Sequence, residues 1–161
     1  MKIHDTTTVY AAADGEVIPL SEVNDEAFSS GMLGEGFAVR PSGGTVYSPV
    51  EGTVEGIAAA RHAYNIRSDS GLDVLVHIGI DTVNLGGDGF TPAVRIGDKV
   101  RAGDVIARAD VAKVRGAGYD PVIPVLIANS ADLGQTQSKL RCGPVRGGKS
   151  AVMTVRAPGK K

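Results

Sequence analysis

Residues 72–80 read Leu-Asp-Val-Leu-Val-His-Ile-Gly-Ile, and this stretch decides the predicted fold. Because successive side chains of a strand point to opposite faces, every second residue shares a face. One face is purely apolar and should point into the core: Leu72, Val74, Val76, Ile78 and Ile80. His77 belongs to the other face, where Gly79 leaves the imidazole uncovered. The stretch therefore predicts a half-buried strand with a histidine on the side away from the core.

Nine further segments of strand length follow the same logic, with turn residues between them. They are Thr8–Ala12, Glu16–Pro19, Phe37–Pro41, Gly44–Tyr47, Gly52–Ala58, Ala63–Ser68, Asp104–Ala109, Val122–Ala128 and Ala151–Ala157. Residues 24–28 and 111–116 are each expected to form a short helical turn. The pattern predicts an all-β fold, an antiparallel β-sandwich or barrel-sandwich hybrid. We expect one domain over residues 1–161, with flexible ends at about 1–8 and 158–161.

The composition argues against several classes of protein. The formal net charge is −1, Trp is absent and no basic block occurs, so a nucleic-acid partner is not expected. A single cysteine, Cys142, cannot build an intrachain disulfide framework. No signal-peptide core and no run of about 18 apolar residues is found, so we expect a cytoplasmic location. His4 lies in a polar leader and is expected to be inert.

A second histidine is placed beside His77 by the predicted hairpin. With a two-residue loop, Asp69-Ser70, paired positions sum to 139 and His62 is directly opposite His77. Directly opposed Cβ atoms are about 4.5–5.5 Å apart. Tyr64 would share the face of His62. A three-residue loop or a bulge would shift this pairing by one residue.

Two imidazoles on one open face suit three roles. One ring can attack phosphorus while the other binds phosphate oxygens, because much of a histidine population is unprotonated near neutral pH. The pair can bind zinc if Asp81 or an outside group completes the site. The rings can also be idle surface residues. Spacing alone leaves the three open.

A family resemblance favours the first role. Residues 74–85, Val-Leu-Val-His-Ile-Gly-Ile-Asp-Thr-Val-Asn-Leu, resemble the signature around the phosphorylated histidine of the glucose-type enzyme IIA family (glucose/N-acetylglucosamine) of the phosphoenolpyruvate-dependent sugar phosphotransferase system. Residues 48–54, 62–64 and 68–71 resemble its other active-site segments. The resemblance covers roughly residues 10 to 135.

The resemblance implies a division of labour. His77 would accept a phosphoryl group from the phosphocarrier protein HPr and pass it to a cysteine of the IIB domain of a sugar permease. His62 would stabilise the phosphohistidine, and no cofactor would be required. The resemblance also implies regulatory docking onto transporters or glycerol kinase, with zinc bridging His62 and His77 at such an interface. The predicted partner surface comprises Phe28, Tyr64, Leu75, Gly79, Asp81 and Val83.

Several of these residues have structural alternatives. Phe28 and Val83 are also plausible core residues, and Asp81 can cap the turn it makes with Thr82. Relatives carry a threonine, hydrogen-bonded to the histidine pair, two residues before the second histidine, where this chain has Ala60. What orients His62 is therefore open.

Two other functions compete with the phosphocarrier. A zinc hydrolase on a similar β-fold would use both histidines, but such a site wants three protein ligands, and neither a His-x-His pair nor a well-placed third histidine is present. A purely regulatory binding module is the second alternative.

Overall fold

The computed structural model describes residues 6–129 and 140–156. Its strands are β1 Thr6–Tyr10, β2 Gly15–Pro19, β3 Glu35–Pro41, β4 Thr45–Tyr47, β5 Gly52–Ile57, β6 Ala63–Ser68, β7 Asp73–His77, β8 Phe90–Pro92, β9 Lys99–Val100, β10 Val105–Ala109, β11 Ile123–Ile127, β12 Gly143–Val145 and β13 Ala151–Arg156. Its helices are α1 Glu26–Ser29 and α2 Val111–Gly116, with 3₁₀ turns η1 Leu20–Glu22 and η2 Thr82–Leu85. The predicted all-β class is confirmed.

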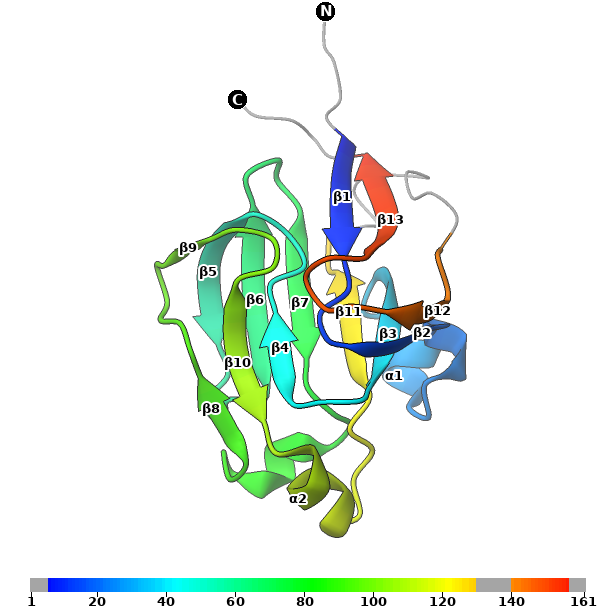
Figure 1. Ribbon diagram of the computed structural model, residues 1–161, viewed down its shortest axis with the longest axis vertical. Coiled ribbons are helices and arrows are strands. Elements are labelled where there is room, and N and C mark those ends of the chain that lie inside the picture. The colour runs from blue at the N-terminus through cyan, green and yellow to red at the C-terminus, as the bar shows by residue number, and fades with distance from the viewer. Residues whose placement is uncertain (1–5, 130–139, 157–161) are drawn as a thin grey trace, which may run out of the picture.

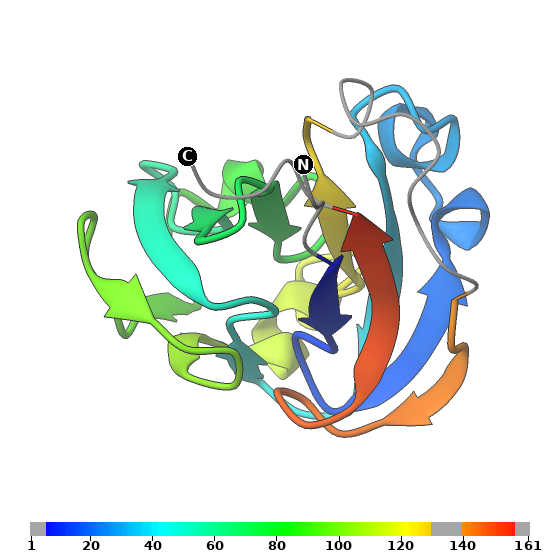
Figure 2. The same cartoon turned by 90° about the horizontal axis from the view of Figure 1, so that it is seen from above.

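Among the described residues every strand pairing is antiparallel, and the strands form three sheets that close no barrel. The largest sheet has the order β12-β2-β3-β11-β7-β6-β5-β9, a smaller one has the order β4-β10-β8, and β1 pairs with β13. In Figure 1, β4, β10 and β8 lie over the β5–β6–β7 part of the large sheet. Seen from above, the large sheet curves between β2 and β12 on one side and β5 on the other (Figure 2).

The two faces of the large sheet carry two separate apolar clusters. The main cluster fills the space between the sheets and includes Val46, Ile66, Val74, Val76 and Ile106, all at 0% exposure. The second cluster lies on the opposite face, because β3 contributes Ala38 to it and Phe37 and Val39 to the first. Its other members are Ile18, Leu20, Val23, Phe28, Ile80, Val122 and Leu126, with Leu75 packed against them.

Most predicted elements are present with small changes of boundary. All ten predicted strand segments contain a strand, and both predicted helical segments contain a helix. The strands that the sequence missed, β8, β9 and β12, have only two or three residues, too few to show an alternation. Residues 6–8, part of the start expected to be flexible, lie in β1, paired with β13. His4 and residues 158–161 lie outside the described residues.

The predicted hairpin register was wrong by one residue. Ala63, not His62, pairs with His77, and Tyr64 pairs with Val76, so that positions sum to 140. The turn has three residues, 69–71, and Ser68 closes it: its amide donates to the carbonyl of Leu72 at 2.8 Å and its Oγ accepts from the Leu72 amide at 2.8 Å. The sequence Asp-Ser-Gly is compatible with a two-residue and a three-residue loop. The hydrogen bond from the Leu72 amide to the Ser68 hydroxyl stabilises the three-residue loop.

Candidate active site

His77 is the last residue of β7, on the face that carries the second cluster. Its Nδ1 lies 2.7 Å from the carbonyl oxygen of Gly79. A carbonyl can only accept a hydrogen bond, so Nδ1 carries the proton and donates it. The lone pair of the neutral ring is therefore on Nε2, which is the nucleophilic nitrogen.

Gly79 holds this geometry through its backbone. Its φ is +82°, in the left-handed region, and a Cβ there would overlap with Cγ2 of Thr82. The Thr82 hydroxyl donates to the carbonyl of Ile78, which fixes the turn from the other side. The predicted reason for this glycine was wrong: β7 ends before Gly79, which positions the imidazole with its carbonyl rather than uncovering it on a strand face.

His62 approaches His77 from the end of the neighbouring strand. The two ring centroids are 4.9 Å apart, with the planes at 88°. The carbonyl of His62 accepts from the amide of Ile78 at 2.6 Å, and the preceding Arg61 has a φ of +63°. This left-handed residue breaks the strand alternation, so His62 reaches His77 although the register pairs His77 with Ala63. The prediction that His62 lies beside His77 is correct, but the turn at Arg61 brings the rings together rather than direct strand pairing.

One ring nitrogen of His62 has no partner. Among the described residues, its Nδ1 is buried without a hydrogen bond. Ala60, at the position where the family resemblance implies a threonine, has no hydroxyl to offer this pair of histidines. The orientation of His62 therefore rests on its backbone and on burial, since the residue is 8% exposed.

Phe28 covers the other side of His77. The two ring centroids are 5.1 Å apart at 60°, an edge-on contact. Phe28 is 6% exposed and belongs to the second cluster, so it is both a core residue and a wall of the site. It reaches His77 because α1, which Asp25 caps by accepting from the Ala27 amide at 2.9 Å, lies on this face.

Burial sets the protonation of both rings. Desolvation lowers the pKa of His62 and is also the main reason that the pKa of His77 is lowered. At His77 the hydrogen bond to Gly79 acts in the opposite direction, His62 adds to the lowering, and the carboxylates of Asp25 and Asp81 raise the pKa. Both imidazoles are thus held neutral near pH 7, the form a nucleophile needs.

Asp25 is a site residue that the sequence analysis missed. Its carboxylate acts on His77 although the two lie far apart in the sequence. The available signal was its position as N-cap residue of a predicted helical turn, which says nothing about what that turn contacts.

The predicted partner-surface residues divide into two groups. Val83 is 53% exposed, Asp81 is exposed and makes no capping hydrogen bond, and Leu75 is half-buried. Phe28, Gly79 and Tyr64 are buried. The prediction for Tyr64 was wrong, because the register shift turns this residue to the core face opposite Val76, in the main cluster. Burial raises the pKa of its hydroxyl to about 12.

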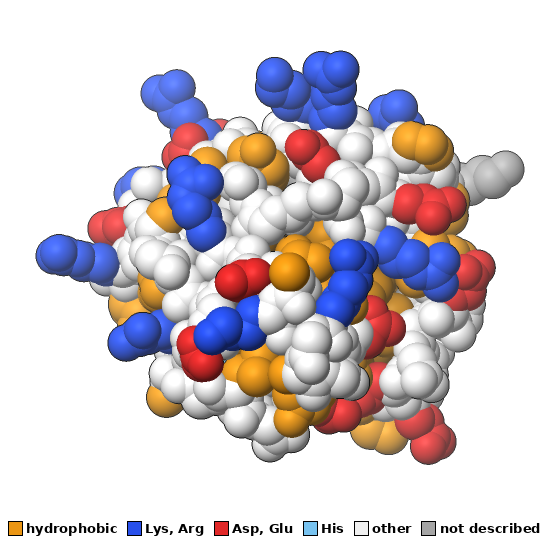
Figure 3. Space-filling view, turned by 60° about the horizontal axis from the view of Figure 1, so that its bottom comes forward, with side chains coloured by type: hydrophobic (Ala, Val, Ile, Leu, Met, Phe, Trp, Pro, Cys, Tyr) orange, Lys and Arg blue, Asp and Glu red, His pale blue; other side chains and the backbone are white. Residues whose placement is uncertain are grey.

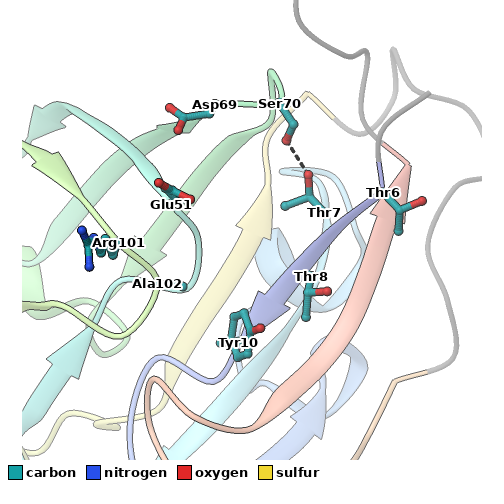
Figure 4. A pocket seen from close by; sticks show the side chains of 9 residues that line it. All are labelled: Thr6, Thr7, Thr8, Tyr10, Glu51, Asp69, Ser70, Arg101 and Ala102. Atoms are coloured by element: carbon teal, nitrogen blue, oxygen red, sulfur yellow. Dashed lines mark hydrogen bonds between the residues drawn. The ribbon is translucent and has the colours of Figure 1, made fainter. Parts of the chain in front are cut away.

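A polar cavity lies at the other end of the β6–β7 hairpin. It has a volume of about 600 Å³ and is lined by hydroxyls and charges, including Thr7, Tyr10, Glu51, Ser70 and Arg101 (Figure 4). The hydroxyl groups of Thr7 and Ser70 contact each other there. None of the lining residues is a histidine or a cysteine, so the nucleophile pair at the opposite end is the better candidate for phosphoryl chemistry.

The two histidines do not make a complete metal centre. No group of three or more His, Cys, Asp or Glu side chains within residues 6–129 and 140–156 is arranged to hold a metal ion. Zinc prefers four ligands in structural sites and three protein ligands in catalytic ones. The pair supplies two, so zinc fits only if another molecule contributes the rest.

The family model described as the phosphoenolpyruvate-dependent sugar phosphotransferase system, EIIA 1, matches residues 7–133. The chain belongs to this EIIA family.

Similar proteins include one of the same size. The EIIA chain is 37% identical to the glucose-specific EIIA component of Oceanobacillus iheyensis, over 92% of this chain and 89% of that protein. The solved glucose permease IIA from Mycoplasma capricolum matches with a TM-score of 0.87 and 34% identity, covering 95% of this chain and 99% of the other. The fold predicted from the resemblance is thereby confirmed.

Other relatives are much longer. A beta-glucoside-specific EIIBCA component of Dickeya chrysanthemi is 46% identical over 78% of the EIIA chain, which covers only 20% of that protein. The chain therefore corresponds to about a fifth of such relatives. Among the helices of residues 6–129 and 140–156, none has the length and apolar character needed to cross a membrane.

Proposed function

We propose that the EIIA chain is a phosphocarrier that accepts a phosphoryl group on Nε2 of His77 from phospho-HPr and passes it to a cysteine of a IIB domain. The observation that carries this proposal is the hydrogen bond from Nδ1 of His77 to the Gly79 carbonyl. It leaves the lone pair on Nε2, next to a second neutral imidazole.

Phosphoryl transfer through His77 needs no cofactor, because each bond that forms is matched by one that breaks. Nε2 of His77 attacks phosphorus, an N–P bond forms, and the P–N bond to the donor histidine breaks. In the second step the cysteine thiolate attacks, an S–P bond forms, and the pair of electrons of the N–P bond returns to Nε2. Phosphoryl transfer needs mainly positioning and charge stabilisation, and His62 supports both by donating a hydrogen bond from Nε2 to the phosphoryl oxygens.

The proposed function includes a cytoplasmic location for the chain, because the resemblance places HPr and the IIB domain there. Regulatory docking onto transporters or glycerol kinase is a second proposed role of the same face. Zinc would bind only at such an interface, held by His62, His77 and a ligand from the partner.

The test is a phosphorylation assay with phosphoenolpyruvate, enzyme I and HPr. The wild-type chain should gain the mass of one phosphoryl group, labile to acid and stable to base. His77→Ala should abolish the gain, whereas His62→Gln should retain it and lose onward transfer. Undiminished phosphorylation of His77→Ala would refute the proposal.

The hydrolase alternative has little support, since the pair brings only two ligands. Regulatory docking should depend on the phosphorylation state of the chain, so pull-downs with the phosphorylated and the unphosphorylated chain should capture different partners if the chain has this role.

A further inference from the structure

Two arginine side chains share a hollow on the rim of the site. Arg61 and Arg95 line a cavity of about 420 Å³, together with Pro92, Ala93, Val94 and Asp98. Arg61 directly precedes His62, so the hollow begins next to the second histidine. It is distinct from the histidine pair itself, which does not line it.

The backbone of Arg61 is held in a turn, and its side-chain stem passes close to Gly87. Its amide donates to the carbonyl of Ala58 at 2.7 Å, in a turn where its φ is +63°. The stem lies against residue 87, since a Cβ built on Gly87 would be 3.7 Å from Cδ of Arg61. The left-handed conformation is unfavourable for a non-glycine residue, so the surrounding turn holds the backbone of Arg61 in it.

Neither guanidinium has an ionic partner within the described part of the chain. The four ion pairs there involve Arg40, Arg67, Lys99 and Lys113 as cations. Asp98 lies in the hollow, but its Oδ2 accepts from the backbone amide of Arg95 at 2.9 Å. A guanidinium is always charged and offers several donors in a fork. The hollow therefore combines two unpaired cations with one carboxylate that is engaged with the backbone.

Charges of opposite sign lie near the two histidines. The carboxylates of Asp25 and Asp81 act on His77, whereas the positive charge of Arg61 acts on the buried Tyr64 hydroxyl of the neighbouring strand. The end of the molecule that includes the C-terminal end of β7 carries both signs among apolar side chains (Figure 3). Such a surface favours one orientation of a docking protein.

We propose that the Arg61–Arg95 hollow is a carboxylate-binding subsite, filled by an acidic side chain of the protein that exchanges the phosphoryl group with His77. This rests on the proposed function. Guanidinium and carboxylate match as a two-pronged hydrogen-bonded pair. The two arginines outweigh the single carboxylate of Asp98, so the hollow carries a net positive charge that attracts an acidic side chain of a protein partner.

The test compares two double variants with the same change of charge. Arg61→Glu/Arg95→Glu removes the subsite, while Arg101→Glu/Arg141→Glu changes exposed arginines elsewhere, Arg101 being at the opposite end of the hairpin. The KM and kcat of transfer from phospho-HPr to the chain, and from the phosphorylated chain to a IIB domain, are measured at low and high salt.

The subsite variant should raise KM in at least one transfer by about tenfold at low salt, with kcat unchanged and a weaker salt dependence, since rim charges act on association. The control should stay within about twofold of wild type. Replacing the contacting acidic residue of the partner by lysine should restore the subsite variant. Equal KM values for the two double variants would overturn the proposal.

A binding measurement separates this proposal from the proposed function. The side-chain Nε–H resonances of Arg61 and Arg95 are followed by NMR while unphosphorylated HPr or IIB is added. If the wild-type chain takes no phosphoryl group but these resonances shift on binding, the proposed function fails and the subsite stands. If they shift with neither partner, the subsite is refuted.

Discussion

At the scale of single residues, Gly79 links the backbone of a turn to the nucleophile. Gly79→Ala should destabilise the fold by roughly 1–3 kcal/mol, because a Cβ at φ +82° meets Thr82. It should also slow phosphorylation, because its carbonyl no longer holds Nδ1 of His77. Urea unfolding and the phosphorylation rate measure the two effects. Gly43→Ala is the matched control, since nothing lies within 4 Å of a Cβ there; equal effects of the two variants would contradict this role.

Asp25 offers a test of the electrostatics of the site. Asp25→Asn removes the charge and keeps an N-cap residue, because asparagine caps helices as well as aspartate does. The pKa of His77 should fall, since the carboxylate raises it. Histidine titration by NMR measures the shift, and Asp88→Asn, whose carboxylate pairs with Lys113, is the control. A pKa that rises in Asp25→Asn would be incompatible with the described charge arrangement.

The lowered histidine pKa values also predict a dependence of stability on pH. The unfolded chain binds protons with a pKa near 6.5, more strongly than the folded chain does. The contribution of the two rings is therefore fully present above about pH 6.5 and is lost as the pH falls below it. The free energy of unfolding should decline less steeply with acidification in His62→Gln/His77→Gln than in wild type. Parallel profiles would refute the assignment.

At the scale of elements, helix α1 acts on the site through one ring. Phe28→Ala should cost about 3–5 kcal/mol, because it opens a cavity in the second cluster. The pKa of His77 should rise towards its ordinary value as water reaches the ring. Val23→Ala is the control, because Val23 belongs to the same cluster but has no ring to place against His77. Unfolding curves and NMR titration distinguish the two, and an unchanged pKa in Phe28→Ala would show that α1 does not shield the nucleophile.

The β6–β7 hairpin shows how far sequence reasoning reaches at this scale. The alternation of residues 72–78 was enough to place His77 on the face away from the main core. It could not choose between a two- and a three-residue turn, because that choice depends on the contact between Ser68 and Leu72. Nor could it show that this face is covered, because the second cluster is assembled from η1, α1, β2, β3 and β11, whose positions depend on tertiary packing.

At the scale of the whole molecule, the curved sheet brings two distant segments to the nucleophile. Phe28 and Asp25 come from a segment that packs on β3 and β11, while His62 comes from the strand next to β7. The sequence could therefore predict the neighbours of His77 that lie in the same hairpin. It could not predict those that reach His77 only through tertiary packing. The missing partner of Nδ1 of His62 could be anticipated from the sequence, because Ala60 stands where the family resemblance implies a hydroxyl.

The central claim is that Nε2 of His77 carries the phosphoryl group because Nδ1 is engaged with Gly79. The most direct test is ¹⁵N and ³¹P NMR of the ¹⁵N-histidine-labelled chain after phosphorylation by phospho-HPr. The account predicts a phosphorus coupling to Nε2 of His77, with Nδ1 still protonated. Coupling to Nδ1 of His77, or to either nitrogen of His62, would contradict it.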